Sequence, residues 1–477
     1  MNTARRLTAN FLSLIFSEFV SKIAQIIIFA YLARSLGKES FGIFSFGLAF
    51  GLLAAIIADF GLSSLLVREI SRSKKDAPKY LSNALLVKIF LALIAAALSY
   101  LTLSLMGYPH NARLIAYIML LFAILQSFTD IYSSIFRAFE HMHYDALIKV
   151  LRMLVLSAIM FFSIKNNFSL AMSSLAFPIS EAAILLTASA LAYTKFVKAD
   201  FSFDFAFSKH LLKESSFFFL SIAFAGIFLY IDWIMLSKLG SLSEVGIYAA
   251  ASNIAIALMS VPMMYGNAVY PVISRFYMSS KERLKFVYER SFKYMLVIGI
   301  AVSAGIYALS KGIIALFYGK EYIASSIVLA IIGWHLCFRF ANIISGFTLS
   351  SMDRQRPRVL SQGVAALSKI ALNFILIPLY GIVGAAIATL ASEILFFAAY
   401  NHFISEYGIK INIIRPFVKP AIAGFIMVAS LIFIGNISEN IFISLISGAL
   451  IYSIAVLLLK TIDEEDKKLM HSIFKNA

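Results

Sequence analysis

The chain has 477 residues, of which 61% are hydrophobic and only 14% are charged. Because soluble proteins average about 25% charged residues, this composition excludes an ordinary soluble protein and predicts a membrane protein. The single cysteine, Cys337, excludes an intrachain disulfide and argues against a thiolate metal cluster. A net charge of +16 would suggest a nucleic-acid partner in a soluble protein, but membrane topology produces such an excess as well.

The predicted elements are all helices, because lipid offers no hydrogen-bond partner to an open strand edge. Apolar runs of about 20 residues or more are long enough to cross a bilayer. They predict an all-α, polytopic membrane protein with about fourteen transmembrane helices. The runs lie near 11–34, 41–67, 81–106, 113–137, 144–164, 169–194, 214–237, 245–271, 293–317, 322–349, 357–377, 380–404, 416–434 and 440–459.

The distribution of basic residues predicts the orientation of these helices. With the N-terminus in the cytoplasm, the predicted cytoplasmic segments hold 30 of the 41 Lys and Arg residues, the external loops hold 7 and the spans hold 4. Basic residues favour the cytoplasmic side of a membrane. The sequence therefore predicts a multi-pass protein of the cell membrane with both termini in the cytoplasm. The same bias explains the positive net charge without nucleic acid.

Short sequences recur in the two halves of the chain. "SLGKESFGIF" at 35–44 resembles "KLGSLSEVGIY" at 238–248, and a Ser-Glu pair ends at Glu181 and again at Glu393. Six spans separate the two copies, and six is even, so both halves insert the same way up as parallel repeats. The predicted domains are an N-lobe with spans 1–6, a C-lobe with spans 7–12, and two additional spans with a cytoplasmic tail, at 1–200, 201–410 and 411–477.

The first span carries an acid and a base near its middle. Glu18 and Lys22 are four residues apart, so a helix places them on one face, which Gln25 extends. An ionised side chain at the centre of a bilayer costs about 3 kcal/mol by insertion scales, so it must either pair with an opposite charge or contact water. Two interpretations stay open: a self-neutralising pair buried between helices, or a face that lines a water-filled cavity.

The repeat sorts the charged residues inside the spans into two groups. Glu181 and Glu393 recur in both halves, so we predict a structural role for them. Other charges occur in one half only, as expected if each lobe supplies different groups to one asymmetric ligand between the lobes. These are Glu18, Lys22, Asp59, Asp232, Arg339 and Lys369.

The cations of this set predict an anion site. A guanidinium group matches phosphate or carboxylate with two parallel hydrogen bonds, and Lys supplies a point charge. Arg339 and Lys369 could instead pair with a neighbouring acid or backbone carbonyl, and Lys88, near the cytoplasmic end of its span, could extend to the surface. The predicted substrate-binding residues are Lys22, Gln25, Lys88, Arg339 and Lys369.

The acids predict ion coupling. Glu18, Asp59 and Asp232 in a cavity wall could carry protons or bind Na⁺. No cofactor and no metal site is expected, because no His, Cys and Asp cluster has metal-ligand spacing. The sequence also has no ATP-binding loop, so energy would come from an H⁺ or Na⁺ gradient, the membrane potential or consumption of the product.

Two basic stretches occupy matching places in the two halves. "SRSKKDAPKY" at 71–80 and "SSKERLKFVYERSFKY" at 279–294 are mildly amphipathic. They are predicted to lie on the inner leaflet and to attract anionic lipid headgroups. The alternative is that membrane topology alone explains their charge.

Four motifs resemble a known family. "ARSLGKESFGIFSF" at 33–46 and "ADFGLSSLLVREISR" at 58–72 resemble the opening of polysaccharide-repeat-unit flippases, and "LFYGKEY" at 316–322 and "IPLYGIVGAAIATLASE" at 377–393 resemble the C-terminal half of the same family. This family belongs to the multidrug/oligosaccharidyl-lipid/polysaccharide exporter superfamily. The resemblance runs over most of the chain.

The resemblance implies a flippase. It implies two six-helix lobes around a central cavity that work by alternating access. The cargo would be an oligosaccharide on a polyprenyl phosphate or diphosphate, moved from the cytoplasmic to the external leaflet for assembly of a cell-surface polysaccharide or glycoprotein glycan. Membrane lipids and glycan-assembly proteins would be the other partners.

Two other functions stay open. The first is a multidrug or metabolite:cation antiporter of the same superfamily, whose cationic cargo would favour acids in the cavity. The second is an enzyme, a membrane glycosyltransferase or polysaccharide polymerase. Such enzymes commonly need a sizeable external loop with acids or His, and the predicted external loops have only a few residues. The sequence therefore favours a transporter over an enzyme.

Overall fold

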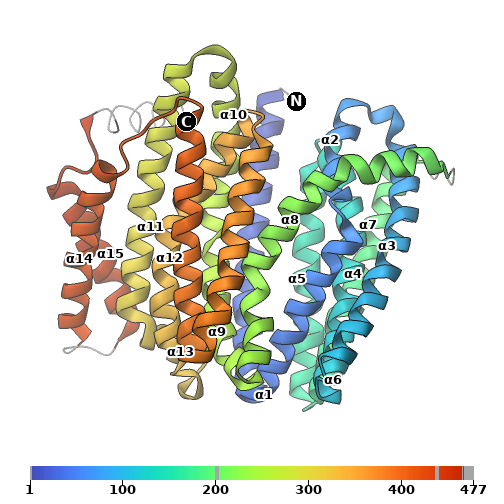
Figure 1. Ribbon diagram of the computed structural model, residues 1–477, viewed down its shortest axis with the longest axis horizontal. Coiled ribbons are helices and arrows are strands. Elements are labelled where there is room, and N and C mark those ends of the chain that lie inside the picture. Colours follow the sequence, from blue (N-terminus) through green and yellow to red (C-terminus); the bar gives the residue numbers. More distant parts are fainter. Residues whose placement is uncertain (1–2, 199–202, 436–439, 465, 467–477) are drawn as a thin grey trace. The chain divides into compact units, whose positions relative to one another are not determined.

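A computed structural model describes residues 3–198, 203–435, 440–464 and 466, with side chains from Ser17 onward (Figure 1). The predicted cytoplasmic tail beyond 466 lies outside the described residues. Throughout the described ranges the chain forms α-helices and two short 3-10 helices and no strand, which confirms the all-α prediction. The α-helices are α1 Thr3–Asp59, α2 Leu62–Arg72, α3 Ala77–Leu105, α4 His110–Ala138, α5 Met142–Lys165, α6 Leu170–Ser174, α7 Ala176–Lys195, α8 Phe205–Leu239, α9 Leu242–Leu258, α10 Ser260–Ser279, α11 Lys281–Phe317, α12 Ser325–Ser351, α13 Gln355–Glu406, α14 Ile414–Gly435 and α15 Ile441–Leu458.

Twelve helical segments of the described chain are long and apolar enough to cross a membrane. Two of them each contain a pair of the predicted spans. Helix α1 breaks at Gly37, which has φ 74° and ψ 168°, and α13 breaks at Gly381, which has φ 55° and ψ −131°. Only glycine adopts such angles without strain. Figure 1 shows α1 running away from the end marked N, reversing, and returning toward α2. The count of fourteen crossings stays a prediction.

The contacts between residues divide the chain into two compact units. Unit 1 contains 1–253 and 369–385, and unit 2 contains 254–368 and 386–477. Each unit is described by itself. The predicted lobes follow the sequence repeat rather than these contacts, so their boundaries stay a prediction.

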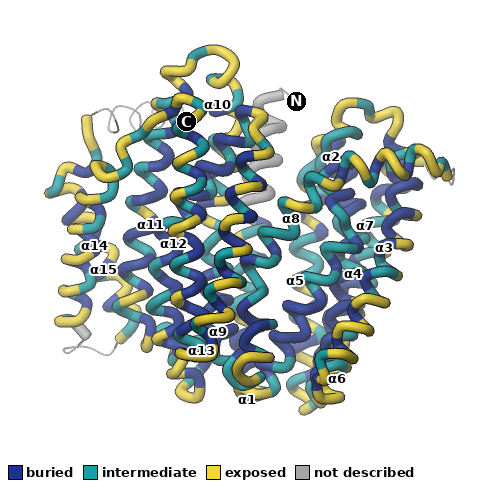
Figure 2. Tube along the Cα trace, in the orientation of Figure 1, coloured by how far each residue is buried: buried dark blue, intermediate teal, exposed yellow. Residues whose placement is uncertain are grey.

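Unit 1 is built around α1 and α4. Helix α1 packs against α3, α4, α5 and α8, and α7 packs against α4 and α5. The short helix α2 places Leu62, Leu65, Leu66 and Ile70 on one side, and all four are fully buried in a core with residues of α3, α4 and α7. Apolar residues at this spacing form the buried stripe of an amphipathic helix. Buried positions run along α4 and α7, as Figure 2 shows.

The two copies of the repeated motif meet inside unit 1. A Cβ atom on Gly42 of α1 would lie 1.7 Å from the carbonyl oxygen of Leu242, and a Cβ atom on Gly246 of α9 would lie 2.1 Å from that of Lys38. The backbones therefore cross in direct contact at equivalent glycines of the two repeats. Glycine is required at both positions because any side chain would overlap backbone atoms.

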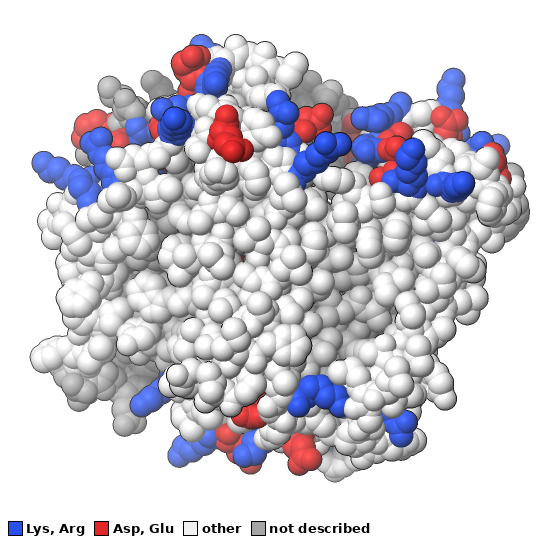
Figure 3. All heavy atoms as spheres, viewed as in Figure 1, with Lys and Arg blue, Asp and Glu red and all other residues white. Residues whose placement is uncertain are grey.

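Unit 2 is built around the pair α11 and α12. Helix α10 packs against both of them, and α14 and α15 pack against α11 and against each other. Exposed positions recur along α14 and α15 (Figure 2). On the face shown in Figure 3, the charged side chains lie at the two ends of the helices, and other residues form the surface between them. This distribution is typical of helices that cross a membrane.

The basic stretch 279–294 does not form a separate surface helix. Residues 281–294 are the first turns of the continuous helix α11. The matching stretch 71–80 contains the end of α2, the 3-10 helix Lys74–Asp76 and the start of α3.

Candidate functional site

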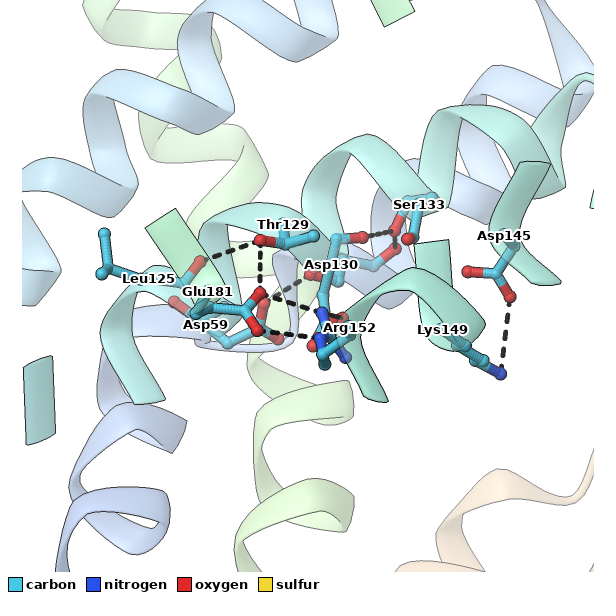
Figure 4. A network of polar contacts seen from close by, with 12 residues as sticks. Asp59, Leu125, Thr129, Asp130, Ser133, Asp145, Lys149, Arg152 and Glu181 are labelled. Atoms are coloured by element: carbon cyan, nitrogen blue, oxygen red, sulfur yellow. Dashed lines mark hydrogen bonds and ion pairs between the residues drawn. The ribbon is translucent and has the colours of Figure 1, made fainter. Parts of the chain in front are cut away.

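Glu181 of α7 is the centre of a buried polar network in unit 1, drawn in Figure 4. Its side chain is fully buried, and Arg152 of α5 binds both carboxylate oxygens, with Nε 2.8 Å from Oε2 and an Nη2 hydrogen bond of 3.0 Å to Oε1. The hydroxyl of Thr129 on α4 donates a second hydrogen bond, of 2.6 Å, to Oε1. Arg152 Nε and Glu181 Oε2 are close enough for an ion pair but do not form a hydrogen bond with each other, so Arg152 compensates the buried charge mainly as a counter-ion. This geometry supports the predicted structural role of Glu181.

Asp130 lies beside this network and is accessible to solvent. Its carboxylate lies 3.9 Å from Arg152, and 45% of its side chain is exposed, whereas Arg152 is only 11% exposed. Asp130 lies on α4 within a membrane-spanning helix. An exposed carboxylate at such a position must face water rather than hydrocarbon.

Glu18 and Lys22 do not pair with each other among the described residues. Lys149 of α5 lies 3.5 Å from Glu18 and 3.5 Å from Asp145 and so bridges the two acids. Lys22 donates a hydrogen bond of 3.3 Å to Gln25, its one hydrogen-bond partner in the described part of the chain. Lys22 and Gln25 are half-buried, and Glu18 is 33% exposed. The self-neutralising Glu18–Lys22 pair is therefore not what the structure shows, and the face containing both residues is accessible.

Lys88 of α3 binds Asp59 at the end of α1. Their salt bridge measures 2.8 Å, and Lys88 is fully buried whereas Asp59 is 16% exposed. Lys88 also donates to the backbone oxygen of Ser127, and Ser63 donates to Asp59 at 2.5 Å. The expectation that Lys88 extends to the surface is wrong, because Asp59 and the backbone oxygen of Ser127 hold its ammonium group inside the unit.

Lys369 of α13 forms a second buried pair in unit 1. Its ammonium group lies 2.7 Å from Asp232 of α8, and both side chains are 2% exposed. Lys369 also donates to the backbone oxygen of Phe228 at 2.6 Å. Asn373 and Tyr248 donate further hydrogen bonds of 2.7 and 2.6 Å to Asp232. The alternative of pairing with a neighbouring acid and a backbone carbonyl is therefore what the structure shows for Lys369, as expected because a cation at this depth needs a counter-charge.

Arg339 of α12 forms the corresponding pair in unit 2. Its Nη2 lies 2.7 Å from Oε2 of Glu393 on α13, and Glu393 is fully buried. Asn342 donates a hydrogen bond of 2.6 Å to the same carboxylate. The alternative of pairing with a neighbouring acid is therefore what the structure shows for Arg339. Glu181 and Glu393, the repeated acids, each form a salt bridge with one arginine.

The structure brings some predicted site residues together and separates others. Glu18, Lys22 and Gln25 share one accessible face of α1. Asp59 with Lys88, Asp232 with Lys369, and Arg339 with Glu393 form three separate buried pairs. A role of the predicted residues in binding or coupling stays a prediction.

Four charged residues of this region escaped the sequence analysis. Asp130 lies inside the predicted span 113–137, so its position alone could have identified it. Arg152 lies inside the run 144–164, but the topology prediction assigned it to the adjacent cytoplasmic segment and so did not treat it as a charge within the membrane. Asp145 and Lys149 lie at the same helix end, and only tertiary packing of α1 against α5 places Lys149 beside Glu18.

Comparisons with known proteins agree with this fold. A model of the polysaccharide biosynthesis protein family matches residues 7–277, and the MatE model matches residues 217–375. The chain is 24% identical over 459 residues to the probable low-salt glycan biosynthesis flippase Agl15 of Haloferax volcanii, a match that covers 91% of this chain and 92% of that protein. It is 25% identical over 178 residues to the capsular polysaccharide biosynthesis protein CapF of Staphylococcus aureus, covering 36% and 43%.

Solved structures share the fold. The lipid II flippase MurJ in an inward closed conformation matches with a TM-score of 0.79 at 19% identity and covers 96% of this chain and 99% of that chain. A multidrug resistance MATE family transporter in an inward-facing conformation matches with a TM-score of 0.66 at 18% identity, covering 82% and 95%. The family suggested by the four motifs is thereby confirmed. Because the first family model spans more than half of the chain, the protein belongs to the polysaccharide biosynthesis protein family, within the multidrug/oligosaccharidyl-lipid/polysaccharide exporter superfamily.

Proposed function

We propose that this protein is a flippase for a lipid-linked oligosaccharide. It moves a glycan on a polyprenyl phosphate or diphosphate from the cytoplasmic to the external leaflet of the cell membrane, with both of its own termini in the cytoplasm. The product would enter assembly of a cell-surface polysaccharide or glycoprotein glycan. The family match and the similarity to a probable glycan flippase over nearly the whole of both chains support this proposal. The relatives whose names state an activity are flippases and transporters, which favours transport over an enzymatic reaction.

The observation that carries the proposal is the accessible charged face of unit 1. A sugar-phosphate headgroup cannot cross hydrocarbon without losing its hydration, so a flippase needs polar groups on the surface of its membrane helices. Lys22, hydrogen-bonded to Gln25 on α1, offers an ammonium group on such a surface. Glu18 and Lys149 lie on the same side, each about one third exposed. The phosphate would take the Lys22 ammonium group as its counter-charge, while alternating access changes the side to which this face opens.

Asp130 is our candidate for H⁺ or Na⁺ coupling. Asp59 and Asp232 each hold a lysine at 2.8 or 2.7 Å, so neither can accept a cation without giving up that partner. Asp130 has its nearest cation, Arg152, at 3.9 Å, and Glu181 already binds that arginine with two oxygens. A carboxylate that shares a cation and remains exposed can bind and release an ion more readily than a paired one.

Complementation tests the function directly. The protein is expressed in a strain that lacks its own oligosaccharide-lipid flippase, and surface glycan is measured. Restored surface glycan is the expected result. No surface glycan, from a protein that is present in the membrane at normal levels, would contradict the proposal.

A cation antiporter is the second candidate, and the MatE match at 217–375 favours it. An antiporter would make cells resistant to cationic dyes and expel such dyes when an H⁺ or Na⁺ gradient is applied. The flippase proposal predicts neither effect. Dye export that depends on Asp130, without surface glycan, would replace the flippase by the antiporter.

A further inference from the structure

Unit 2 contains a pocket of about 650 Å³ that takes no part in the proposed transport site. Three separate segments line it: the start of α11, the residues around the start of α14, and the residues that follow α15. All three segments were predicted from the sequence to be cytoplasmic. Their meeting at one pocket agrees with that topology, since segments on opposite sides of a membrane could not share a pocket.

Paired charges form one wall of this pocket. Arg290 of α11 lies 2.8 Å from Asp466 and also contacts Asp463, and Lys293 lies 3.1 Å from Asp463 and contacts Asp466. The backbone N–H groups of Asp463 and Asp466 each donate a hydrogen bond of 2.9 Å to the carboxylate of the other. Asp466 is fully buried. The wall is therefore a fixed structure that attaches the segment after α15 to α11.

Three further cations line the pocket, as do two acids, Glu289 and Glu464. The cations are Arg415, Lys419 and Lys460, and all three are exposed. Lys419 donates to the backbone oxygen of Lys460 at 3.1 Å, which holds the two lysines next to each other. No carboxylate is within ion-pair distance of these three cations among the residues that the structure describes.

One residue that lines the pocket has a buried hydroxyl group without a partner. Thr461 lines the pocket and is only 5% exposed. Its Oγ1 atom has no hydrogen-bond partner in the described part of the protein. A buried hydroxyl without a partner costs about 1–3 kcal/mol, so a ligand that accepts its hydrogen bond would recover this energy.

We propose that this pocket binds the phosphate headgroup of an anionic membrane phospholipid. The phosphate oxygens would accept hydrogen bonds from Thr461 and face Arg415, Lys419 and Lys460. The pocket lies where spans meet water, because the membrane-spanning segment of α14 begins at Ile414 and that of α15 ends at Leu458. Ile414 and Val418 are exposed apolar residues that would contact the acyl chains. Basic pockets between helices on the cytoplasmic side are suited to such headgroups.

Native mass spectrometry of the purified full-length protein tests this inference. Phosphatidylglycerol and phosphatidylcholine are added in turn, and the bound fraction is measured for each. The wild type should bind phosphatidylglycerol in preference. Arg415→Ala, Lys419→Ala and Lys460→Ala should each weaken that binding about fivefold, the equivalent of one basic residue near a membrane surface. Thr461→Val should weaken it at unchanged net charge.

Lys410→Ala is the matched control, because Lys410 is exposed just before the start of α14 but does not line the pocket. If Lys410→Ala and Lys419→Ala weaken binding equally, the interaction is general surface attraction and the proposed site does not exist. Inorganic phosphate is titrated as a competitor. If it binds as tightly as the lipid, the ligand is free phosphate and the lipid assignment is wrong. Thr461→Val keeps the test valid should a charge variant fail to fold.

This inference stands apart from the proposed flippase function. Loss of lipid selectivity in Lys419→Ala with normal surface glycan would support the pocket and leave the transport site untouched. Equal binding of both lipids by the wild type would overturn the pocket without affecting the flippase proposal.

Discussion

Lys369 and Asp232 form a salt bridge of 2.7 Å in which both side chains are 2% exposed. Such a pair neutralises itself, and its desolvation leaves little net stabilisation. Removing one partner is different, because it leaves the other charge buried without compensation. The pair therefore fits a structural role, in which it links α8 to α13. The sequence predicted instead that Lys369 binds the substrate and that Asp232 takes part in ion coupling.

Double substitution distinguishes these roles. Lys369→Met alone should lower the free energy of unfolding by about 3–5 kcal/mol, because it leaves the Asp232 carboxylate buried without a counter-charge. The double variant Lys369→Met with Asp232→Asn should recover most of this loss, since no charge is left unpaired. The free energy is measured by detergent titration of the purified protein. Full surface glycan in a stable double variant confirms an architectural role, and lost glycan at normal stability would restore the predicted ligand role of Lys369.

The Gly42–Gly246 crossing predicts that both positions are intolerant to side chains. Gly42→Ala and Gly246→Ala should each lower the free energy of unfolding by about 1–3 kcal/mol, because an added methyl group must displace backbone atoms. Gly305→Ala is the control, since its Cβ would meet only the flexible end of Met427 at 3.2 Å. Equal melting temperatures for all three variants would contradict the crossing.

Much of the fold was predictable from the sequence because it depends on local signals. Apolar runs identified the helices, and the repeated motif contains Gly42 and Gly246 of the crossing and Gly37, where α1 breaks. The partners of the buried charges were not predictable. Lys149 reaches Glu18 through the packing of α1 on α5, a contact between residues 131 positions apart.

The repeat relates the buried acids of the two halves but not their cationic partners. Glu181 and Glu393 recur, and each binds one arginine, but Arg152 and Arg339 come from helices that are not equivalent in the two halves. Arg339 and Lys369 each have a buried carboxylate partner, so packing offers an explanation for their presence in one half besides the predicted ligand. A charge without a counterpart in the other half is not by itself evidence of a ligand site.

Asp130 and Asp59 should respond differently to neutralisation. Asp130→Asn should leave the melting temperature nearly unchanged, because Asp130 is exposed and 3.9 Å from Arg152, but it should abolish dependence of transport on an H⁺ or Na⁺ gradient. Asp59→Asn should instead destabilise the protein by removing the partner of buried Lys88. Transport in proteoliposomes with and without the gradient gives the answer. Unchanged gradient dependence in Asp130→Asn would remove Asp130 from ion coupling.

The wall of the unit 2 pocket predicts a loss of stability in acid. Partial burial acts to raise the pKa of Asp463, but hydrogen bonds from Arg290, the Asp466 backbone N–H and Lys293 outweigh burial and hold the pKa well below its usual range. A lowered pKa in the folded state stabilises the protein above the unfolded-state pKa of about 3.9. That contribution is lost as pH falls from there through the folded-state pKa.

The melting temperature of the purified protein between pH 6 and pH 3 measures this effect. The wild type should lose stability below about pH 4, where the unfolded aspartate takes up its proton. Asp463→Asn should be less stable than the wild type at pH 6 and should show a shallower loss on acidification. Parallel curves for the two proteins would contradict the account of this ionic wall.

Lys22 remains the cation on which the proposed transport site depends. It lies on a membrane-spanning segment of α1, is half-buried, and has Gln25 as its hydrogen-bond partner among the described residues. Lys22→Ala removes the charge, Lys22→Arg keeps it, and Lys285→Ala is the control at an exposed lysine of α11. None of these changes breaks a buried salt bridge, so each variant should fold.

The most direct measurement is the rate at which a fluorescent polyprenyl-diphosphate oligosaccharide crosses from one leaflet to the other in proteoliposomes. The account predicts that Lys22→Ala slows translocation at least tenfold, that Lys22→Arg restores most of the rate, and that Lys285→Ala matches the wild type. Translocation by Lys22→Ala at the wild-type rate would contradict the proposal that this charged face of α1 binds the phosphate.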